Sequence, residues 1–193
     1  MPDRDVHTIK ELIYYQYAKV MARSAFGPDA KKESYGFIKQ SFRDLKEGRK
    51  QWSEITREDK QFIQTEKKCL YCGSTDNLQW EHIVPKSIKL NDRCPVCERL
   101  QGIHNQVWAC SKCNLEKGDK GLYSHFQTIF PGDRKYYDRI PALLEKKYLK
   151  TIYFCHECAG TLDNGDLDGD GSITVLDIDK VLHLQCIGQD GKT

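Results

Sequence analysis

Four pairs of cysteines, each with two residues between its members, constrain the fold of this chain more than any other feature. The pairs are Cys69/Cys72, Cys94/Cys97, Cys110/Cys113 and Cys155/Cys158. A Cys-x-x-Cys turn presents two thiolates to a metal ion, and a structural zinc ion takes four ligands in a tetrahedron. Eight cysteines suffice for two such ions. We predict that Cys69, Cys72, Cys110 and Cys113 hold one zinc ion, and that Cys94, Cys97, Cys155 and Cys158 hold the other.

The ninth cysteine, Cys186, is left over and is predicted to be a small buried apolar side chain. An odd count leaves one cysteine unpaired in any disulfide scheme. The sequence begins MPDRDVHTIKEL, with early acids and no apolar core of a secretory signal. No apolar run approaches the roughly 18 residues of a membrane span. We therefore expect a cytoplasmic chain without a membrane segment, whose cysteines bind metal.

The formal net charge of +2 hides an uneven distribution. Residues 151–193 contain two basic and eight acidic residues, a formal charge of −6, which leaves +8 for residues 1–150. A basic body can hold a polyanion, because neutralising phosphates releases the counterions condensed on them. The charge is compatible with nucleic acid as a partner, although many basic faces are only solvated.

The first helix is predicted from its ends. Thr8 and Glu11 have the spacing of a capping box, which marks a helix start. Apolar residues then recur at helical spacing until Gly27 and Pro28 end the pattern. The tyrosines on this apolar stripe are more typical of core packing than of base stacking.

Three further helices and one strand are predicted outside the cysteine-rich segment. The helices cover residues 31–47, 53–66 and 142–150, and the strand covers residues 152–154. The N-terminal region is thus predicted to be a helical subdomain.

The central segment is predicted to form a ββα unit. Residues 78–82 and 105–109 have the composition of strands, and residues 111–118 that of a short helix. The first and third cysteine pairs flank this unit and would clamp its ends.

In this unit the residues resemble the HNH endonuclease family, also called ββα-metal or His-Me finger nucleases. The resemblance rests on Glu81-His82-x-x-Pro85-x-Ser87, on Asn105, and on Cys110-x-x-Cys113-Asn114-x-x-Lys117. It covers about a third of the chain, and the composite pattern is specific where any single piece is not.

The resemblance implies a role for each matching residue. His82 is implied as the general base that takes a proton from the attacking water, because an imidazole titrates near neutrality. Glu81 and Asn114 are implied as ligands of a catalytic divalent ion, Mg²⁺ or Mn²⁺, which prefers oxygen and would stabilise the leaving group. Asn105 is implied to orient His82.

Two lysines, Lys86 and Lys117, are the predicted contacts to nucleic acid. His104 stands next to Asn105 but is interpreted as a non-catalytic histidine whose hydrogen bonds are made within its loop. The same interpretation applies to His7, His125, His156 and His183.

Residues 166–177 match a twelve-residue calcium loop. The predicted ligands are Asp166, Asp168, Asp170, Ser172 and Asp177, with Gly171 at the sharp turn. The segment resembles a single EF-hand or dockerin-type repeat. We predict Ca²⁺ in a structural role; a solvated acidic loop is the alternative.

Together these features predict an α+β protein in three parts. Residues 1–66 form a helical subdomain, residues 67–160 a zinc-bound HNH core, and residues 161–193 an acidic calcium-loop tail. The predicted function is hydrolysis of phosphodiester bonds in double-stranded DNA, in a restriction, defence or mobile-element setting. A homodimer would allow both strands to be cut.

Other function classes fit less well. A zinc module that binds nucleic acid or protein without catalysis has no need of Glu81, His82, Asn105 and Asn114. A zinc deaminase needs His-x-Glu and Pro-Cys-x-x-Cys, which the chain lacks. An extracellular calcium-dependent adhesion module is suggested by the acidic loop alone.

Overall fold

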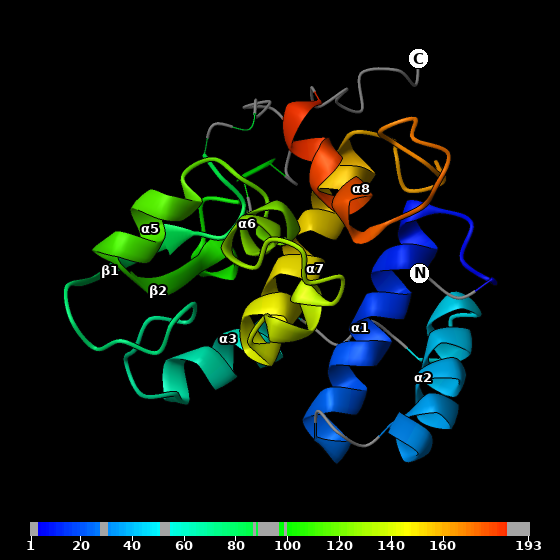
Figure 1. Ribbon diagram of the computed structural model, residues 1–193, viewed down its shortest axis with the longest axis horizontal. Helices are drawn as coiled ribbons and strands as arrows, with labels where there is room; N and C mark the ends of the chain where they lie inside the picture. Colours follow the sequence, from blue (N-terminus) through cyan, green and yellow to red (C-terminus); the bar gives the residue numbers. More distant parts are fainter. Residues whose placement is uncertain are drawn as a thin grey trace.

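The computed structural model describes residues 4–27, 31–50, 55–86, 88, 97–98 and 100–184. Helices dominate these residues, and the two strands described pair in one small antiparallel sheet (Figure 1). The predicted α+β class is confirmed at this level. The sheet and the short helix after it lie at one end of the molecule, and the first two helices lie at the other (Figure 1).

Helix α1 (Ile9–Phe26) begins where the sequence predicts. The Thr8 hydroxyl accepts a hydrogen bond from the backbone N–H of Glu11 at 3.2 Å, which satisfies a donor of the first turn. The Glu11 carboxylate accepts from the backbone N–H of His7 at 2.7 Å, one residue before the position of a standard capping box. Gly27 ends the helix with φ at 83°, a left-handed value that glycine adopts without strain.

Helices α2 (Lys31–Lys46) and α3 (Ile55–Gln64) correspond to the second and third predicted helices. Helix α2 packs antiparallel along α1 and forms a helical hairpin with it (Figure 1). Helix α3 instead packs on the long helix α7 (Ala142–Cys158) and so connects the N-terminal region to the centre of the molecule.

The predicted helix over residues 142–150 is confirmed, but the predicted strand over residues 152–154 is wrong, because helix α7 continues through that segment. The triplet Ile152-Tyr153-Phe154 has β propensity. However, Tyr148, Ile152 and Cys155 continue one buried helical stripe past residue 150. Tertiary burial of that stripe outweighs the local preference of three residues. The Cys155/Cys158 pair therefore lies in the last helical turn rather than in a loop.

The ββα unit has the predicted order. Strand β1 (Leu78–His82) pairs with β2 (Gln106–Cys110), with Trp80 opposite Trp108 and His82 opposite Gln106. Helix α5 (Ser111–Lys117) follows β2 directly. Asn105, predicted to start the second strand, closes a 3-10 turn, η1 (Ile103–Asn105), just before it.

One hydrophobic core joins the three predicted parts. Buried side chains from α1, from the ββα unit and from the C-terminal segment belong to the same cluster, and examples are Ile13, Val107 and Ile178. The remaining elements pack on this core: α6 (Leu122–Ile129), η2 (Tyr136–Arg139), α8 (Val175–Asp179) and η3 (Lys180–His183). The expected boundaries near residues 66 and 160 are therefore not breaks in the packing.

The C-terminal segment is held to the rest of the protein by hydrogen bonds as well as by apolar contacts. The backbone N–H groups of Ile9 and Lys10, at the start of α1, donate to the carbonyls of Asn164 (2.7 Å) and Leu162 (2.9 Å). The buried Asp179 carboxylate accepts from the Ser124 backbone N–H at 2.7 Å and from the Tyr148 hydroxyl at 2.5 Å. The acidic segment is thus an integral part of the fold.

Buried ion pairs fasten α3 to α7. Lys150 pairs with Glu58, and Lys147 pairs with Asp59; all four side chains are almost fully buried. Burial lowers the pKa of both lysines, although the carboxylates oppose this effect. His104 Nδ1 lies 2.5 Å from the Asp59 carboxylate, so its interpretation as a satisfied histidine is confirmed.

Within the described residues, no helix combines the length and the apolar character needed to cross a bilayer.

Candidate active site and metal centres

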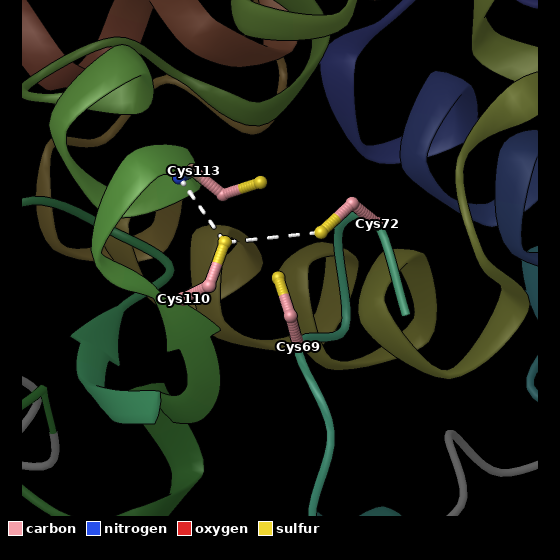
Figure 2. Close-up of side chains that lie close together, drawn as sticks. All are labelled: Cys69, Cys72, Cys110 and Cys113. Carbon is pink, nitrogen blue, oxygen red and sulfur yellow. Dashed lines mark hydrogen bonds between the residues drawn. The ribbon is translucent and has the colours of Figure 1, made fainter. Parts of the chain in front are cut away.

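Four cysteine sulfurs converge at the base of the ββα unit (Figure 2). Cys69 and Cys72 come from a turn ahead of β1, Cys110 ends β2, and Cys113 lies in the first turn of α5. All four sulfur atoms lie within 4.8 Å of one another. The predicted grouping of these four residues is therefore present, and the cluster could hold a metal ion.

The geometry fits a tetrahedral metal. Thiolates bound at about 2.3 Å in a tetrahedron lie about 3.8 Å apart along each edge, and Cys72 Sγ and Cys110 Sγ are 3.8 Å apart. Burial would raise the pKa of Cys69, but hydrogen bonds from nearby backbone N–H groups lower it below its ordinary value. Burial and the neighbouring sulfurs raise the pKa of Cys113. Four thiolates therefore need a cation to coexist there.

The second predicted zinc site can be described only in part, because Cys94 lies outside the described residues. Cys186, the leftover cysteine, also lies outside them. Cys97 Sγ and Cys158 Sγ are 3.7 Å apart, close to the same tetrahedral edge. Cys158 is disulfide-bonded, however, and a sulfur in a disulfide is not a thiolate ligand. The buried Cys155 thiol donates to the Thr151 carbonyl at 3.6 Å. A second zinc ion stays a prediction that would require Cys158 in its reduced form.

A pocket of about 260 Å³ opens beside the sheet, and three of the four predicted catalytic residues line it; Asn105 does not. Its walls come from β1, the turn after it, and α5 with the turn that ends α5. The lining residues are Trp80, Glu81, His82, Pro85, Lys86, Asn114, Gly118 and Asp119. The fold therefore brings Asn114, which is distant in sequence, next to the adjacent residues Glu81 and His82, and places Lys86 at the same opening.

His82 has the properties of a base at neutral pH. Burial lowers the pKa of its imidazole, and the positive charges of Lys86 and Lys117 lower it further. The ring is therefore neutral near pH 7 and can accept a proton. The His82 ring contacts the side-chain amide of Gln106, with Gln106 Nε2 lying 3.4 Å from His82 Nε2.

Glu81 is more enclosed than a simple metal ligand. Its carboxylate receives the Lys117 ammonium at 2.8 Å on one oxygen and the Tyr71 hydroxyl at 2.7 Å on the other. Burial raises the pKa of Glu81, and Lys117 and Tyr71 oppose that rise. An oxygen-rich wall fits a hard cation. However, the charge of Glu81 is already matched by Lys117, so a second cation would have to share its oxygens.

Lys117 differs from its predicted role. Its side chain is fully buried, and the ammonium also donates to the backbone carbonyl of His82 at 3.1 Å. A direct contact of Lys117 with nucleic acid does not fit this burial. Instead Lys117 connects α5 to the end of β1, and so fixes Glu81 and His82 relative to each other.

Asn105 also acts differently from the expectation that it orients His82 directly. Its side-chain oxygen accepts from the Val84 backbone N–H at 2.7 Å, and its amide nitrogen donates to the carbonyls of Val84 (2.8 Å) and Leu100 (3.0 Å). Its backbone carbonyl accepts from Ile83 at 2.9 Å. Asn105 therefore holds the chain that follows His82 and positions the histidine through the backbone.

The site includes residues that were not predicted, among them Tyr71 and Asp119. Tyr71 supports Glu81 from the turn between Cys69 and Cys72, and only the fold brings them together. Asp119 adds an exposed carboxylate to the pocket, directly after Gly118, whose φ of 53° turns the chain at the end of α5. The short distance in sequence between Asn114 and Asp119 is a signal that could have identified the latter.

The acidic loop brings part of its predicted ligand set together. Carboxylate oxygens of Asp166, Asp168 and Asp177 lie within 4.8 Å of one another and could hold a metal ion. Asp170 is not part of that group. The backbone N–H groups of Gly171 and Gly169 lower the pKa of Asp166, so this carboxylate stays charged. Asp177 is fully buried and accepts from the backbone N–H groups of Leu167 (2.8 Å) and Thr174 (2.7 Å).

Two buried histidines differ in how they are satisfied. His156 contacts the Thr161 hydroxyl at 2.8 Å and the Ile178 carbonyl at 3.0 Å, as expected for a satisfied histidine. His125 contradicts that expectation, since neither ring nitrogen has a hydrogen-bond partner among the described residues. It packs edge-on against Tyr71 with ring centroids 5.7 Å apart. Burial lowers the pKa of each histidine to about 4.

These pKa values predict a loss of stability in acid. The unfolded chain binds a proton at each histidine near pH 6.5, whereas the folded protein binds it only near pH 4. The stability that each buried, neutral histidine contributes is therefore fully present above pH 6.5. It is lost as the pH falls toward 4, by up to about 3 kcal/mol per histidine. Urea unfolding of wild type and His125→Phe at several pH values measures it. The substitution should flatten the acid slope and preserve stability at pH 7; an unchanged slope would contradict the assignment.

Comparison of the chain with protein-family models, with curated protein sequences and with solved structures gives no match.

Proposed function

We propose that this protein is a metal-dependent endonuclease of the HNH type that hydrolyses phosphodiester bonds in DNA. The observation that carries the proposal is the convergence of Glu81, His82 and Asn114 on one pocket of a ββα unit clamped by four cysteines. A structural metal site alone has no need of a neutral histidine or an amide in a neighbouring pocket. The non-catalytic zinc module is the alternative.

Each pocket residue has a part in the proposed reaction. His82 takes a proton from water, and the resulting hydroxide attacks phosphorus as the bond to the leaving oxygen breaks. Asn114 and Glu81, with Asp119 nearby, offer oxygen atoms to Mg²⁺ or Mn²⁺. Such an ion supplies charge stabilisation to the phosphate and to the leaving oxygen. Lys86, exposed at the opening, attracts the DNA backbone.

The four-cysteine cluster is proposed to hold Zn²⁺ as a structural ion. Sulfur ligands, fourfold coordination and an edge of 3.8 Å favour zinc over a hard cation. It lies below the pocket residues in the same ββα unit, since Cys110 and Cys113 flank the start of the helix that carries Asn114. The proposed zinc thus holds the frame of the site and takes no part in the chemistry.

Cleavage of supercoiled plasmid in the presence of Mg²⁺ or Mn²⁺ tests the proposal. We expect wild type to nick or linearise the plasmid, and His82→Ala to lower the rate by about 10²- to 10⁴-fold because it removes the general base. His183→Ala is the matched control, since His183 is exposed and lies outside the pocket.

Equal cleavage by wild type and His82→Ala would remove His82 from the mechanism. A protein that binds DNA with full zinc content but cleaves nothing would favour the non-catalytic module instead.

A further inference from the structure

A large aromatic side chain is exposed at the mouth of the pocket. Trp80, on β1, keeps 46% of its surface exposed. It stacks on its cross-strand partner Trp108 with ring centroids 4.0 Å apart and an angle of 25° between the planes. Phe62 of α3 packs against it with centroids 6.0 Å apart. The indole is therefore held in place by two rings while much of its surface remains open to solvent.

This exposed ring is next to the proposed chemistry. Trp80 lines the same pocket as His82 and Asn114. Side chains alternate along a strand, so Trp80 and His82 lie on the same face of β1, about 7 Å apart along it. A flat group stacked on Trp80 would place its attached phosphate near the histidine.

The surroundings of the ring are positively charged. The Lys67 ammonium lies 5.3 Å above the Trp108 ring, and the exposed Lys86 lies at the pocket. Residues 1–150, which include this face, hold a formal charge of +8. A supported aromatic ring between cations is the arrangement that binds single-stranded nucleic acid, because bases stack on the ring while the cations attract the backbone.

We propose that Trp80 is a stacking platform for an unpaired nucleobase next to the scissile phosphate. The inference rests on the proposed nuclease function and refines its substrate. In an intact duplex each base face is covered by its neighbours, so stacking on a side chain requires a base in a single strand or one flipped out of a duplex. Trp80 therefore favours DNA with unpaired bases at the site of cleavage.

Binding measured in a His82→Ala background separates recognition from cleavage. The probes are a fluorescein-labelled oligothymidylate, a fully paired duplex of equal length, and the same duplex with a central mismatched bubble. Trp80→Ala should weaken binding of the oligothymidylate about 5- to 100-fold, as expected for the loss of one base–aromatic stack. Trp80→Phe should retain most of the affinity. Binding of the paired duplex should change less than twofold.

Weaker binding of the bubble duplex, in addition to that of the single strand, would identify flipped or locally unpaired bases as substrates; a loss with the single strand alone would identify single-stranded DNA. Ile63→Ala is the matched control, because Ile63 of α3 is an apolar side chain that is 67% exposed and outside the pocket. Thermal melting of each variant verifies folding. Quenching of intrinsic fluorescence by the oligothymidylate should also decrease in Trp80→Phe.

Unchanged affinity of Trp80→Ala, or an equal loss with all three probes, would overturn the stacking role. That result would leave the nuclease proposal standing if wild type cleaves plasmid. A Trp80-dependent preference for unpaired bases in a protein that cleaves no DNA would instead retain the platform and reject the hydrolysis.

Discussion

Replacement of Cys113 by serine is expected to abolish binding of the zinc ion proposed for the four-cysteine cluster and to unfold the ββα unit. Cys113 is buried, and its sulfur lies within 4.8 Å of the other three. A hydroxyl is a poor substitute for a thiolate ligand of zinc. Apparent metal-binding energies in small zinc modules are about 10–16 kcal/mol at neutral pH, so the loss of one ligand removes much of the stability of such a unit.

The ββα unit has little else to hold it together at that end. The apolar cluster around the cysteines contains Ala109, with Tyr71 and Leu78 partly buried beside it. A two-stranded sheet on its own is marginally stable in water. A metal ion held by the four cysteines would therefore supply the cross-link that a larger core supplies elsewhere in the protein.

Metal content by native mass spectrometry and limited proteolysis together measure this effect. We expect Cys113→Ser to lose one zinc ion and to be cleaved within residues 67–118, whereas Leu115→Ala should behave like wild type. Leu115 is in the same helix but is 85% exposed, so it controls for substitution in α5. An unchanged zinc content and protease resistance in Cys113→Ser would show that this cluster does not bind the ion.

Replacement of Lys117 by methionine is expected to lower the free energy of unfolding by about 3–5 kcal/mol. The substitution retains the volume of the side chain but leaves the Glu81 carboxylate buried without its cation, 2.8 Å from where the ammonium lay. Glu81 is 3% exposed, so hydration compensates the lost partner only in small part. The cost is the uncompensated charge rather than the loss of packing.

The double variant Glu81→Gln/Lys117→Met distinguishes these two causes. Removing both charges should recover part of the stability, because a neutral amide can still accept from Tyr71. The loss in Lys117→Met should also shrink in acid, since burial already raises the pKa of Glu81 and a protonated carboxyl needs no cation. Urea unfolding of the singles and the double at two pH values gives the coupling energy. Equal losses in Lys117→Met and the double would assign the effect to packing.

The local parts of the fold were accessible from the sequence. Residues 78–82 and 111–117 have clear strand and helix patterns, and the spacing of the first and third cysteine pairs specified their common cluster. These features depend on neighbours a few residues apart. Helix α7 was misjudged over residues 152–154, because the burial that decides its conformation comes from packing against α1 and α3.

The chemistry of the site was only partly accessible for the same reason. The sequence could identify Glu81, His82 and Asn114 as candidates, and the pocket brings them together. It could not show that Lys117 pairs with Glu81, because an ammonium four residues after Cys113 looks solvated until the helix is placed against β1. Long-range packing thus determines which polar residues hold the site in place, as Lys117 does, and which remain accessible to a substrate.

The hydrogen bonds between the two ends of the described chain have a consequence for synthesis. The N–H groups of Ile9 and Lys10 find their acceptors at Asn164 and Leu162, more than 150 residues later. A ribosome delivers the first helix long before those carbonyls exist, so these two N–H groups have only water to bond to in the interval. A chain stalled before residue 160 would lack both acceptors and also the apolar side chains, such as Ile178, that share a core with α1.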